Sequence, residues 1–367
     1  MKRVFYLTIA LLCVSISLQF FSGYTFAQND QSNQDNLKVY SKFDFVPGDE
    51  VIFEDDLTSE QVGEFPSRWD LTKGTIENAT FDGSKVIYFI KCNTNGGGGI
   101  VPLLKNNNED YLPEEFTFEL DAYFEDIHSS YTIYFSDYKY QTKLDKEYKK
   151  EDKWIRFKDY NFDGNGIEPA WLLGYSNSNY AGIFRPGWRR ISISFNKRAL
   201  KTYIDETRLL NIPNLDYNPT GITIGFHTPS GKTKGYIKNI RIAKGAVPLY
   251  DKLITDGKII TTGIKFDVNK STLKPESMGV INDIYNLMFQ HPELNFSIEG
   301  HTDTDGSDDS NMKLSELRSI TVLNQLVSMG IDSKRLKAKG FGESKPLSDN
   351  NTSEGKANNR RVEFVKF

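Results

Sequence analysis

The sequence predicts two domains of different fold class, an all-β jelly-roll sandwich followed by a smaller α/β domain with a mixed sheet. Between residues 51 and 243, short alternating runs of apolar and polar residues are separated by turn residues, which is typical of a β-sandwich. After Lys252 the strands alternate with segments of helical period, which is typical of a compact α/β unit. Two domains also suit the length of 367 residues, at about 100–200 residues per domain.

Composition and periodicity divide the chain into five segments. We predict a signal peptide at residues 1–27, a disordered polar lead-in at 28–41 and the sandwich at 42–248. A short linker at 249–257 then leads to the α/β domain at 258–367.

The first segment has the pattern of an export signal. Lys2 and Arg3 precede an apolar run from residue 4 to residue 21, and Thr25-Phe26-Ala27 offers small residues at the cleavage positions. An uncleaved membrane anchor is the alternative, but polar residues interrupt the run and no basic flank follows it. We therefore expect a mature chain in the periplasm, without a transmembrane span.

Cysteine usage and charge argue against a lipid anchor, an intramolecular disulfide and a nucleic-acid partner. Cys13 follows Leu12, whereas a lipid-attachment cysteine needs a small residue before it. After cleavage Cys92 would have no second cysteine for an intramolecular disulfide. The formal net charge is −4 and the basic residues are dispersed, which argues against nucleic acid as a partner.

The predicted strands of the first domain share period-two alternation and are rich in Phe and Tyr, which favour strands. Turn residues such as Asn196-Lys197-Arg198 separate them. The clearest runs span 116–124, 131–135, 154–157, 190–195, 200–204, 221–226 and 236–242.

The second domain follows the order strand, helix, strand, helix, strand, and then a short helix and a last strand. Pro275 starts the first helix and His291-Pro292 stops it, while Gly330 closes the second helix, whose apolar residues recur at threes and fours. The predicted strands span 259–266, 294–298, 336–340 and 361–367, and the short helix spans 352–358.

Two charged residues of this domain, Asp303 and Arg318, together suit a zwitterionic ligand. Asp303 follows a strand, and Arg318 is predicted one turn into the next helix. A carboxylate binds an ammonium group, and a guanidinium binds a carboxylate in bidentate fashion, through bonds about twice as strong as neutral ones. The alternative is an internal salt bridge between the two residues that only fixes the helix.

The second domain resembles the OmpA-like peptidoglycan-binding domain, which outer-membrane protein A, motor stator proteins and peptidoglycan-associated lipoproteins share. The resemblance covers about the last third of the chain, and Ser319 departs from the alanine usual in the family. The matching residues are Phe266-Asp267-Val268-Asn269, Glu299-Gly300-His301-Thr302-Asp303, Asn311, Leu314-Ser315, Arg318, Gly340-Phe341-Gly342-Glu343, Pro346 and Asn358-Asn359-Arg360-Arg361-Val362-Glu363.

This resemblance implies a ligand, the diaminopimelate of Gram-negative peptidoglycan. Asp303 would bind its free ammonium group and Arg318 its neighbouring carboxylate. A lysine-type wall lacks that second carboxylate and would leave Arg318 unpaired, which costs a few kcal/mol. The resemblance also implies that the pocket is lined by Asp267, Asn269, Thr302, Asn311, Leu314 and Arg360.

The first domain is similar to concanavalin- and laminin-G-like jelly rolls. The similarity lies in the run 187–195, in Tyr203-Ile204-Asp205 and in the run 237–242. It implies a surface for a carbohydrate or a protein, although a fold alone does not specify a function.

Three carboxylates, Glu119, Asp121 and Glu125, resemble the catalytic cluster of jelly-roll glucanases. Retaining glycosidases hold two carboxyl groups about 5–5.5 Å apart, which next-but-one residues of a strand can supply. Glu125, however, lies beyond the family spacing, and period-two alternation is more typical of a solvated strand face. We expect no catalytic residues.

The other apparent motifs do not predict a phosphate-binding or metal-binding site. Ser230-Gly231-Lys232-Thr233 has Phe226 where a phosphate loop needs its first glycine. The loop 161–166 resembles a calcium loop, but Leu172 stands at the twelfth position. We predict no metal ligand in the chain, His301 included, and the sequence leaves a structural Ca²⁺ elsewhere in the sandwich open.

Together these observations predict a non-catalytic cell-envelope protein that binds peptidoglycan and is associated with the wall and the outer membrane. The sandwich would present a surface to a glycan or to an outer-membrane protein. A wall-tethered glycan hydrolase and a lectin remain the alternatives, and no cofactor is predicted.

Overall fold

The structure is a computed structural model that describes residues 44–367 with gaps. The chain divides into Met1–Lys38, outside the described residues, and one compact unit, Val39–Phe367, to which everything below refers. Within residues 44–367 the gaps are 93–98, 105–109, 127–128, 137–152, 159–166, 170–185, 216, 228–232 and 246–248. The predicted signal peptide and lead-in, the phosphate-loop mimic and the apparent calcium loop thus lie wholly or mostly outside the described residues.

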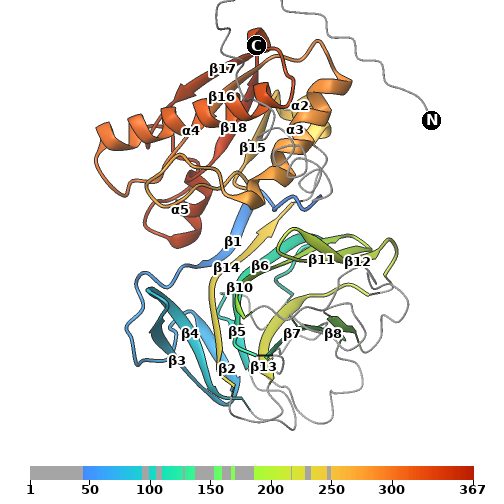
Figure 1. Ribbon diagram of the computed structural model, residues 1–367, viewed down its shortest axis with the longest axis vertical. Helices are drawn as coiled ribbons and strands as arrows, with labels where there is room; N and C mark the ends of the chain where they lie inside the picture. Colours follow the sequence, from blue (N-terminus) through green and yellow to red (C-terminus); the bar gives the residue numbers. More distant parts are fainter. Residues whose placement is uncertain are drawn as a thin grey trace, which may run out of the picture. The chain divides into compact units, whose positions relative to one another are not determined.

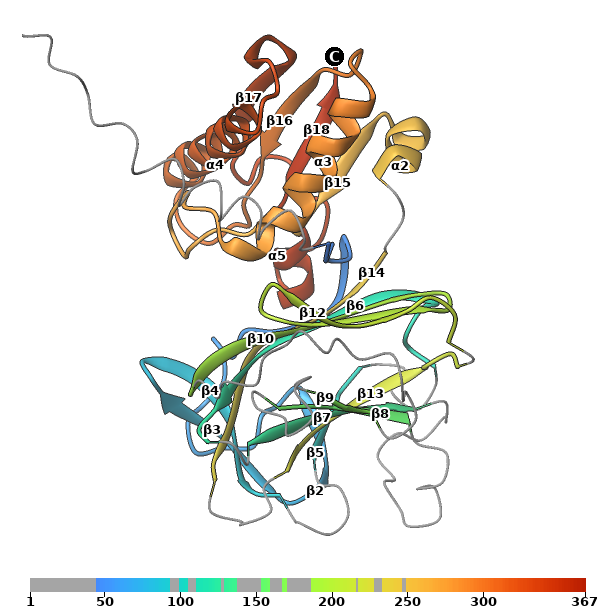
Figure 2. The same ribbon diagram turned by 45° about the vertical axis from the view of Figure 1, so that its right-hand side comes forward.

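The N-terminal region consists of two β-sheets, which form two layers (Figures 1 and 2). The eight-stranded sheet has the order β12-β11-β10-β6-β14-β4-β3, with β1 paired to β14. Its strands are β1 Glu50–Asp55, β3 Thr75–Phe81, β4 Ser84–Lys91, β6 Glu115–Phe124, β10 Gly187–Asn196, β11 Ala199–Ile204, β12 Thr207–Ile212 and β14 Gly235–Lys244.

The second sheet has six strands in the order β2-β5-β13-β7-β8-β9. They are β2 Trp69–Lys73, β5 Gly99–Pro102, β7 Ser130–Ser136, β8 Lys153–Phe157, β9 Ile167–Pro169 and β13 Gly221–His227.

One apolar core lies between the two sheets. Along β6, Phe116, Phe118 and Phe124 are fully buried in this core, whereas Glu119 and Asp121 lie on the opposite face. This is the period-two alternation of a strand that has one face on the core. Burying one such phenylalanine contributes about 1.5–3 kcal/mol.

The seven clearest predicted strands all form, which confirms that the N-terminal region is mostly β-sheet. The further strands β1 to β5, β9 and β12 were not singled out by the sequence. The jelly-roll connectivity remains a prediction.

The C-terminal region has a four-stranded mixed sheet of order β15-β18-β16-β17, in which β16 and β17 are parallel. Helices α3 and α4 cover one face of it (Figures 1 and 2). The elements are α2 Leu249–Asp256, β15 Lys258–Thr261, η2 Pro275–Ser277, α3 Met278–Gln290, β16 Phe296–Gly300, α4 Asp308–Ser328, η3 Ser333–Arg335, β17 Leu336–Gly340, α5 Ser353–Asn359 and β18 Val362–Lys366. No helix among the described residues combines the length and the apolar character that a membrane span requires.

Several boundaries differ from the predicted ones, since the first α-helix begins at Met278 after a 3₁₀ turn at Pro275 and the strand predicted at 294–298 spans Phe296–Gly300. The strand predicted at 259–266 ends at Thr261, because the backbone N–H and C=O of Lys265 both hydrogen-bond to the Ser277 hydroxyl instead of a neighbouring strand. Helix α2 occupies most of the segment predicted as a linker. Helix α4 begins at Asp308, because Ser307 caps it by accepting the N–H of Ser310.

Two glycines allow α4 to lie close to the sheet. A Cβ at Gly300 would meet the Ser315 carbonyl oxygen at 2.3 Å, and a Cβ at Gly340 would meet the Glu316 backbone nitrogen at 2.5 Å. Gly300 and Gly340 are register partners on β16 and β17. This close approach places the middle of α4 next to the loop that follows β16.

Candidate functional site

The loop after β16 holds Asp303 in a fixed position. The backbone N–H of Thr302 donates to the Gly342 carbonyl oxygen at 2.9 Å, and the Asn311 side-chain amide donates to the Asp303 carbonyl oxygen at 3.2 Å. Three segments of the domain therefore fix the backbone around Asp303: the loop itself, the loop after β17 and the first part of α4.

Asp303 is buried, with 9% of its side chain exposed, and its carboxylate lies beside Arg360. Its Oδ1 accepts the backbone N–H of Asp305 at 3.1 Å, and its Oδ2 accepts Nη1 of Arg360 at 2.7 Å. Burial lowers the pKa of the Arg360 guanidinium, but the Glu54 and Asp303 carboxylates outweigh this effect and hold that pKa above its ordinary value.

The Arg318 guanidinium lies in the same neighbourhood without a carboxylate bonded to it among the described residues. Its Nε donates to the Lys270 carbonyl oxygen at 3.0 Å, and its central carbon lies 4.9 Å from the centre of the Phe266 ring. Burial lowers the pKa of Arg318, against the attraction of Asp303. The two terminal nitrogens of Arg318 make no hydrogen bond within the described part of the chain, so they can bind an anion.

The structure therefore pairs Asp303 with Arg360 and not with Arg318, contrary to the alternative of an internal Asp303–Arg318 salt bridge. Arg318 also lies nearly three helical turns into α4, not one, because the helix begins before the residues that the sequence suggested.

The other predicted pocket residues come from three elements around this pair. Asn311 and Leu314 lie on α4, Thr302 precedes Asp303, and Asp267 and Asn269 lie on the loop after β15. Asn269 has a φ of 56°, a left-handed conformation that asparagine tolerates better than most residues. The Thr302 hydroxyl is buried and has no hydrogen-bond partner in the described residues. The ligand roles of all these residues remain predictions.

Sequence reasoning missed four contributions to this geometry. Phe266 and Glu343 belong to the matching motifs, but only the structure shows what they contact. The Phe266 ring lies under the Arg318 guanidinium, and Glu343 accepts a hydrogen bond from the Asn311 amide at 2.6 Å. Lys270 contributes only a carbonyl oxygen. Glu54 is about 300 residues from Arg360 in sequence, and no local pattern signals their contact.

One protein family matches the part of the chain that contains these residues. Residues 265–360 match the OmpA family. These residues form an OmpA-family domain. The domain includes Asp303, Arg318 and Arg360.

Curated relatives match over part of the chain. Outer membrane porin F of Pseudomonas fluorescens is 45% identical over 100 residues, which is 27% of this chain and 31% of the porin. The probable lipoprotein YiaD of Escherichia coli K12 is 32% identical over 142 residues, 36% of this chain and 63% of that protein. Motility protein B of Bacillus subtilis is 37% identical over 124 residues, 32% of this chain and 48% of that protein. This chain thus spans from under a third to somewhat under two thirds of these relatives.

Solved structures also match part of the chain. A putative MotB-like protein from Desulfovibrio vulgaris is 33% identical, covers 30% of this chain and 71% of its own, and has a TM-score of 0.28. The peptidoglycan-associated lipoprotein from Burkholderia pseudomallei is 22% identical, covers 33% of this chain and 99% of its own, and has a TM-score of 0.29.

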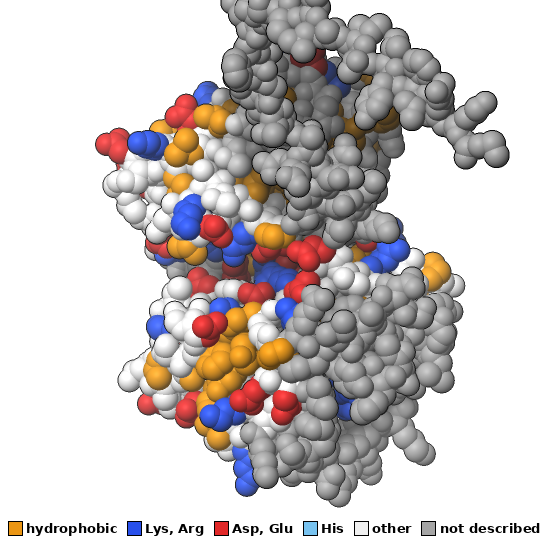
Figure 3. Space-filling view, viewed as in Figure 1, with side chains coloured by type: hydrophobic (Ala, Val, Ile, Leu, Met, Phe, Trp, Pro, Cys, Tyr) orange, Lys and Arg blue, Asp and Glu red, His pale blue; other side chains and the backbone are white. Residues whose placement is uncertain are grey.

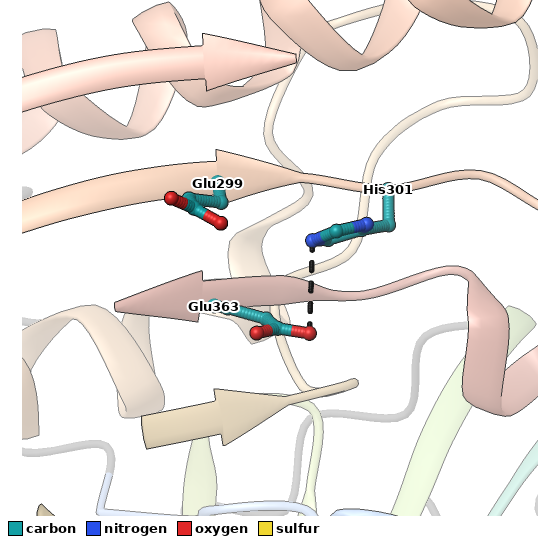
Figure 4. A group of neighbouring side chains, drawn as sticks. All are labelled: Glu299, His301 and Glu363. Atoms are coloured by element: carbon teal, nitrogen blue, oxygen red, sulfur yellow. Dashed lines mark ion pairs between the residues drawn. The ribbon is translucent and has the colours of Figure 1, made fainter. Parts of the chain in front are cut away.

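A second cluster in the C-terminal region contains Glu299, His301 and Glu363 (Figure 4). Glu299 and Glu363 face each other across β16 and β18, and one ligand atom from each of the three residues lies within 4.8 Å of the others. Glu299 lies two residues before His301 in the sequence, and the pairing register of β16 with β18 brings Glu363 beside both.

The charges around this cluster do not favour a metal ion. Glu363 accepts hydrogen bonds from Nε of Arg361 at 2.7 Å and from Nζ of Lys258 at 2.8 Å. Each of its two oxygens therefore already binds a cationic group. The His301 ring stacks on Phe341 with 5.3 Å between ring centres. Burial, and then the Arg361 charge, lower the pKa of His301 to about 4. The cluster is best explained as a neutral buried histidine beside a neutralised acid.

The carboxylates Glu119 and Asp121 of the N-terminal region both bind Arg190, at 2.7 Å and 2.9 Å. Glu119 is 1% exposed and also binds Arg241 at 2.8 Å and Lys265 at 3.3 Å. It is therefore buried, contrary to the expectation of a solvated strand face. Burial raises its pKa, but Lys265, Arg190 and Arg241 outweigh this and hold the pKa well below its usual range. A carboxylate held ionised in this way is unsuited to act as a general acid.

Removing the charge of Glu119 should destabilise the protein. Glu119→Gln leaves Arg241 and Lys265 without their anion and leaves Arg190 with Asp121 alone. We expect a loss of about 3–5 kcal/mol in the free energy of unfolding, measured by urea denaturation. Glu115→Gln on the same strand is the control, because its partner Lys197 is largely exposed, and it should cost under about 1 kcal/mol. Equal stability of Glu119→Gln and wild type would contradict the buried network.

The lowered pKa of His301 predicts a stability change in acid. Because the folded pKa, about 4, is below the unfolded one of 6.5, the unfolded chain takes up the proton first as the pH falls. His301 should therefore lower the free energy of unfolding by about 2 kcal/mol when the pH falls from 7 to 5, and it should have almost no effect above pH 7. Urea denaturation of wild type and His301→Gln at both pH values measures this. Parallel losses in the two proteins would show that His301 is not held neutral.

Proposed function

We propose that this protein is a non-catalytic component of the Gram-negative cell envelope that binds the diaminopimelate of peptidoglycan through its OmpA-family domain. The curated relatives support an envelope role, since they include outer membrane porins and a probable lipoprotein. The family resemblance supports the wall as the ligand. A periplasmic location beside the wall and the outer membrane belongs to the same proposal.

The observation that carries this proposal is the arrangement of Asp303 and Arg318. Asp303 is a buried carboxylate whose position is fixed by backbone bonds, and Arg318 has terminal nitrogens free of protein acceptors within the described residues. A free diaminopimelate end carries an ammonium and a carboxylate on one carbon atom. It would satisfy both residues at once through charge-assisted hydrogen bonds.

The affinity of one such site for a small ligand should be modest, because binding removes translational and rotational freedom. The wall, however, is a repeating polymer, so dissociation from one stem peptide is followed by rebinding to the next. Retention by the wall therefore exceeds the affinity of one site.

The N-terminal region would present a separate surface, for which one feature favours a glycan over a protein. Tyr88, Tyr236, Tyr123 and Trp188 are successive cross-strand partners on β4, β14, β6 and β10, on the face opposite the core. Phe81 stacks on Tyr236 with 4.0 Å between ring centres. Hydrophobic side chains gather over this part of the sheet (Figure 3).

Polar groups border these rings in the way that sugar recognition requires. Trp188 Nε1 donates to Asp82 at 3.2 Å, and the Lys238 ammonium lies 4.1 Å from the centre of a Trp188 ring. Aromatic rings with adjoining donors and acceptors suit a polyhydroxylated ligand. A lectin role for this region is therefore the second candidate function, and a hydrolase acting through Glu119 is disfavoured by the ionised, buried state of that residue.

Wall binding is tested by co-sedimentation with purified diaminopimelate-type sacculi. We expect Asp303→Asn and Arg318→Gln to stay folded and to lose most of their sedimentation, because each removes one charge partner of the ligand. Asp309→Asn and Lys313→Gln, exposed on the same helix, should sediment like wild type. Wild-type sedimentation by all four variants would refute the proposal.

Glycan binding by the N-terminal region is tested on a glycan array with the full chain. Trp188→Ala should lower the affinity for any bound glycan by about 10-fold or more, as expected for an aromatic residue central to a contact surface. Trp154→Ala, in the other sheet, is the matched control. If the wild type binds no glycan, the hypothesis that this surface binds a protein replaces the lectin hypothesis.

A further inference from the structure

Helix α5 of the OmpA-family domain contacts β1 of the N-terminal region. Asn358 Oδ1 accepts the Val51 backbone N–H at 2.9 Å, and Asn358 Nδ2 donates to the Val51 carbonyl oxygen at 3.3 Å. One turn earlier in α5, Glu354 Oε1 accepts the backbone N–H of Glu54 at 3.1 Å. Side chains from one face of α5 thus bind the backbone of β1 at two positions.

This contact brings the Glu54 carboxylate to Arg360, the residue that follows α5. Arg360 Nη2 lies 3.5 Å from Glu54 Oε1, while its Nη1 bonds to Asp303 Oδ2 at 2.7 Å. The second Glu54 oxygen, Oε2, is buried and has no hydrogen-bond partner among the described residues. Arg360 therefore lies between two carboxylates, and Glu54 retains an unused acceptor.

We infer that Glu54 is a positioning residue of the proposed diaminopimelate site, acting through Arg360, so that a residue of the N-terminal region sets the affinity of the C-terminal domain. The inference rests on the proposed function of Asp303 and Arg318. It assigns to β1 a role in ligand binding in addition to its role in the eight-stranded sheet.

The charges explain why the site requires Glu54. Arg360 forms ion pairs with both Asp303 and Glu54. When the ligand ammonium bonds to Asp303, it must share that carboxylate with Arg360, and two cations then lie close together. Glu54 offers Arg360 a second anion, which offsets this repulsion.

The same relation holds in reverse. A ligand ammonium that shares Asp303 weakens the bond between Arg360 and Asp303, so Arg360 moves toward Glu54 and the contact between α5 and β1 becomes stronger. Binding couplings are reciprocal, so wall binding should stabilise this contact as much as the contact favours wall binding.

The test measures the affinity of the full chain for a soluble disaccharide tripeptide that ends in diaminopimelate. Glu54→Gln keeps the shape and removes the charge, and we expect about 5- to 20-fold weaker binding, within the usual range of coupling between sites. Glu54→Asp, which keeps the charge, should stay within about threefold of wild type. Glu50→Gln is the control, because Glu50 lies on the same strand and pairs with the exposed Lys244.

A second background distinguishes positioning from a general structural effect. If Glu54 acts through Arg360, then Glu54→Gln should cause no further loss in a protein that already carries Arg360→Gln. The inference is wrong if Glu54→Gln binds the muropeptide as tightly as wild type. It is also wrong if Glu54→Gln weakens binding by the same factor in the Arg360→Gln protein as in wild type.

The wild-type protein offers a measurement that needs no variant. Saturation with the same muropeptide should slow amide hydrogen exchange at Val51 and Glu54, whose N–H groups bond to α5. Unchanged exchange at both amides contradicts the inference. If Asp303→Asn binds the muropeptide as well as wild type, the proposed function itself fails, which is distinct from a failure at Glu54 alone.

Discussion

The candidate site depends on how the charge of the buried Asp303 carboxylate is shared. A carboxylate whose side chain is 9% exposed requires cationic or hydrogen-bonding partners, and this one has Arg360 and a backbone N–H. The partner is not Arg318, which instead uses its Nε on a backbone carbonyl and lies over Phe266. Because the anion and the second guanidinium do not neutralise each other directly, both retain capacity for a ligand that carries both charges.

Two other buried acids among the described residues, Glu119 and Glu363, are neutralised directly by cations of the chain itself. Glu119 is surrounded by Arg190, Arg241 and Lys265, and Glu363 by Arg361 and Lys258. In each, the cations of the chain itself bind the carboxylate oxygens, so burial of the acid is compensated internally. Such pairs stabilise the fold mainly because removal of either partner would leave a buried charge.

Much of the C-terminal domain could be predicted from its sequence, because its signals are local. Pro275 marked the 3₁₀ turn that leads into the first helix, and Gly330 follows the end of the second. The motif around Asp303 indicated the candidate site. The failures concern pairings between distant residues. The neighbours of His301 depended on the register of β16 with β18, and the partner of Arg360 on a strand about 300 residues away. In the N-terminal region, alternation identified strands, but the fate of Glu119 depended on cations from β10, β14 and the segment after β15.

The claim that Asp303 and Arg318 together hold the end of a diaminopimelate is tested most directly by NMR of the arginine side chains during titration with the soluble muropeptide. The account predicts that the Nε–Hε signal of Arg318 shifts on binding, together with the backbone amides that surround Asp303. A saturable interaction that leaves both unchanged and moves signals elsewhere would contradict it.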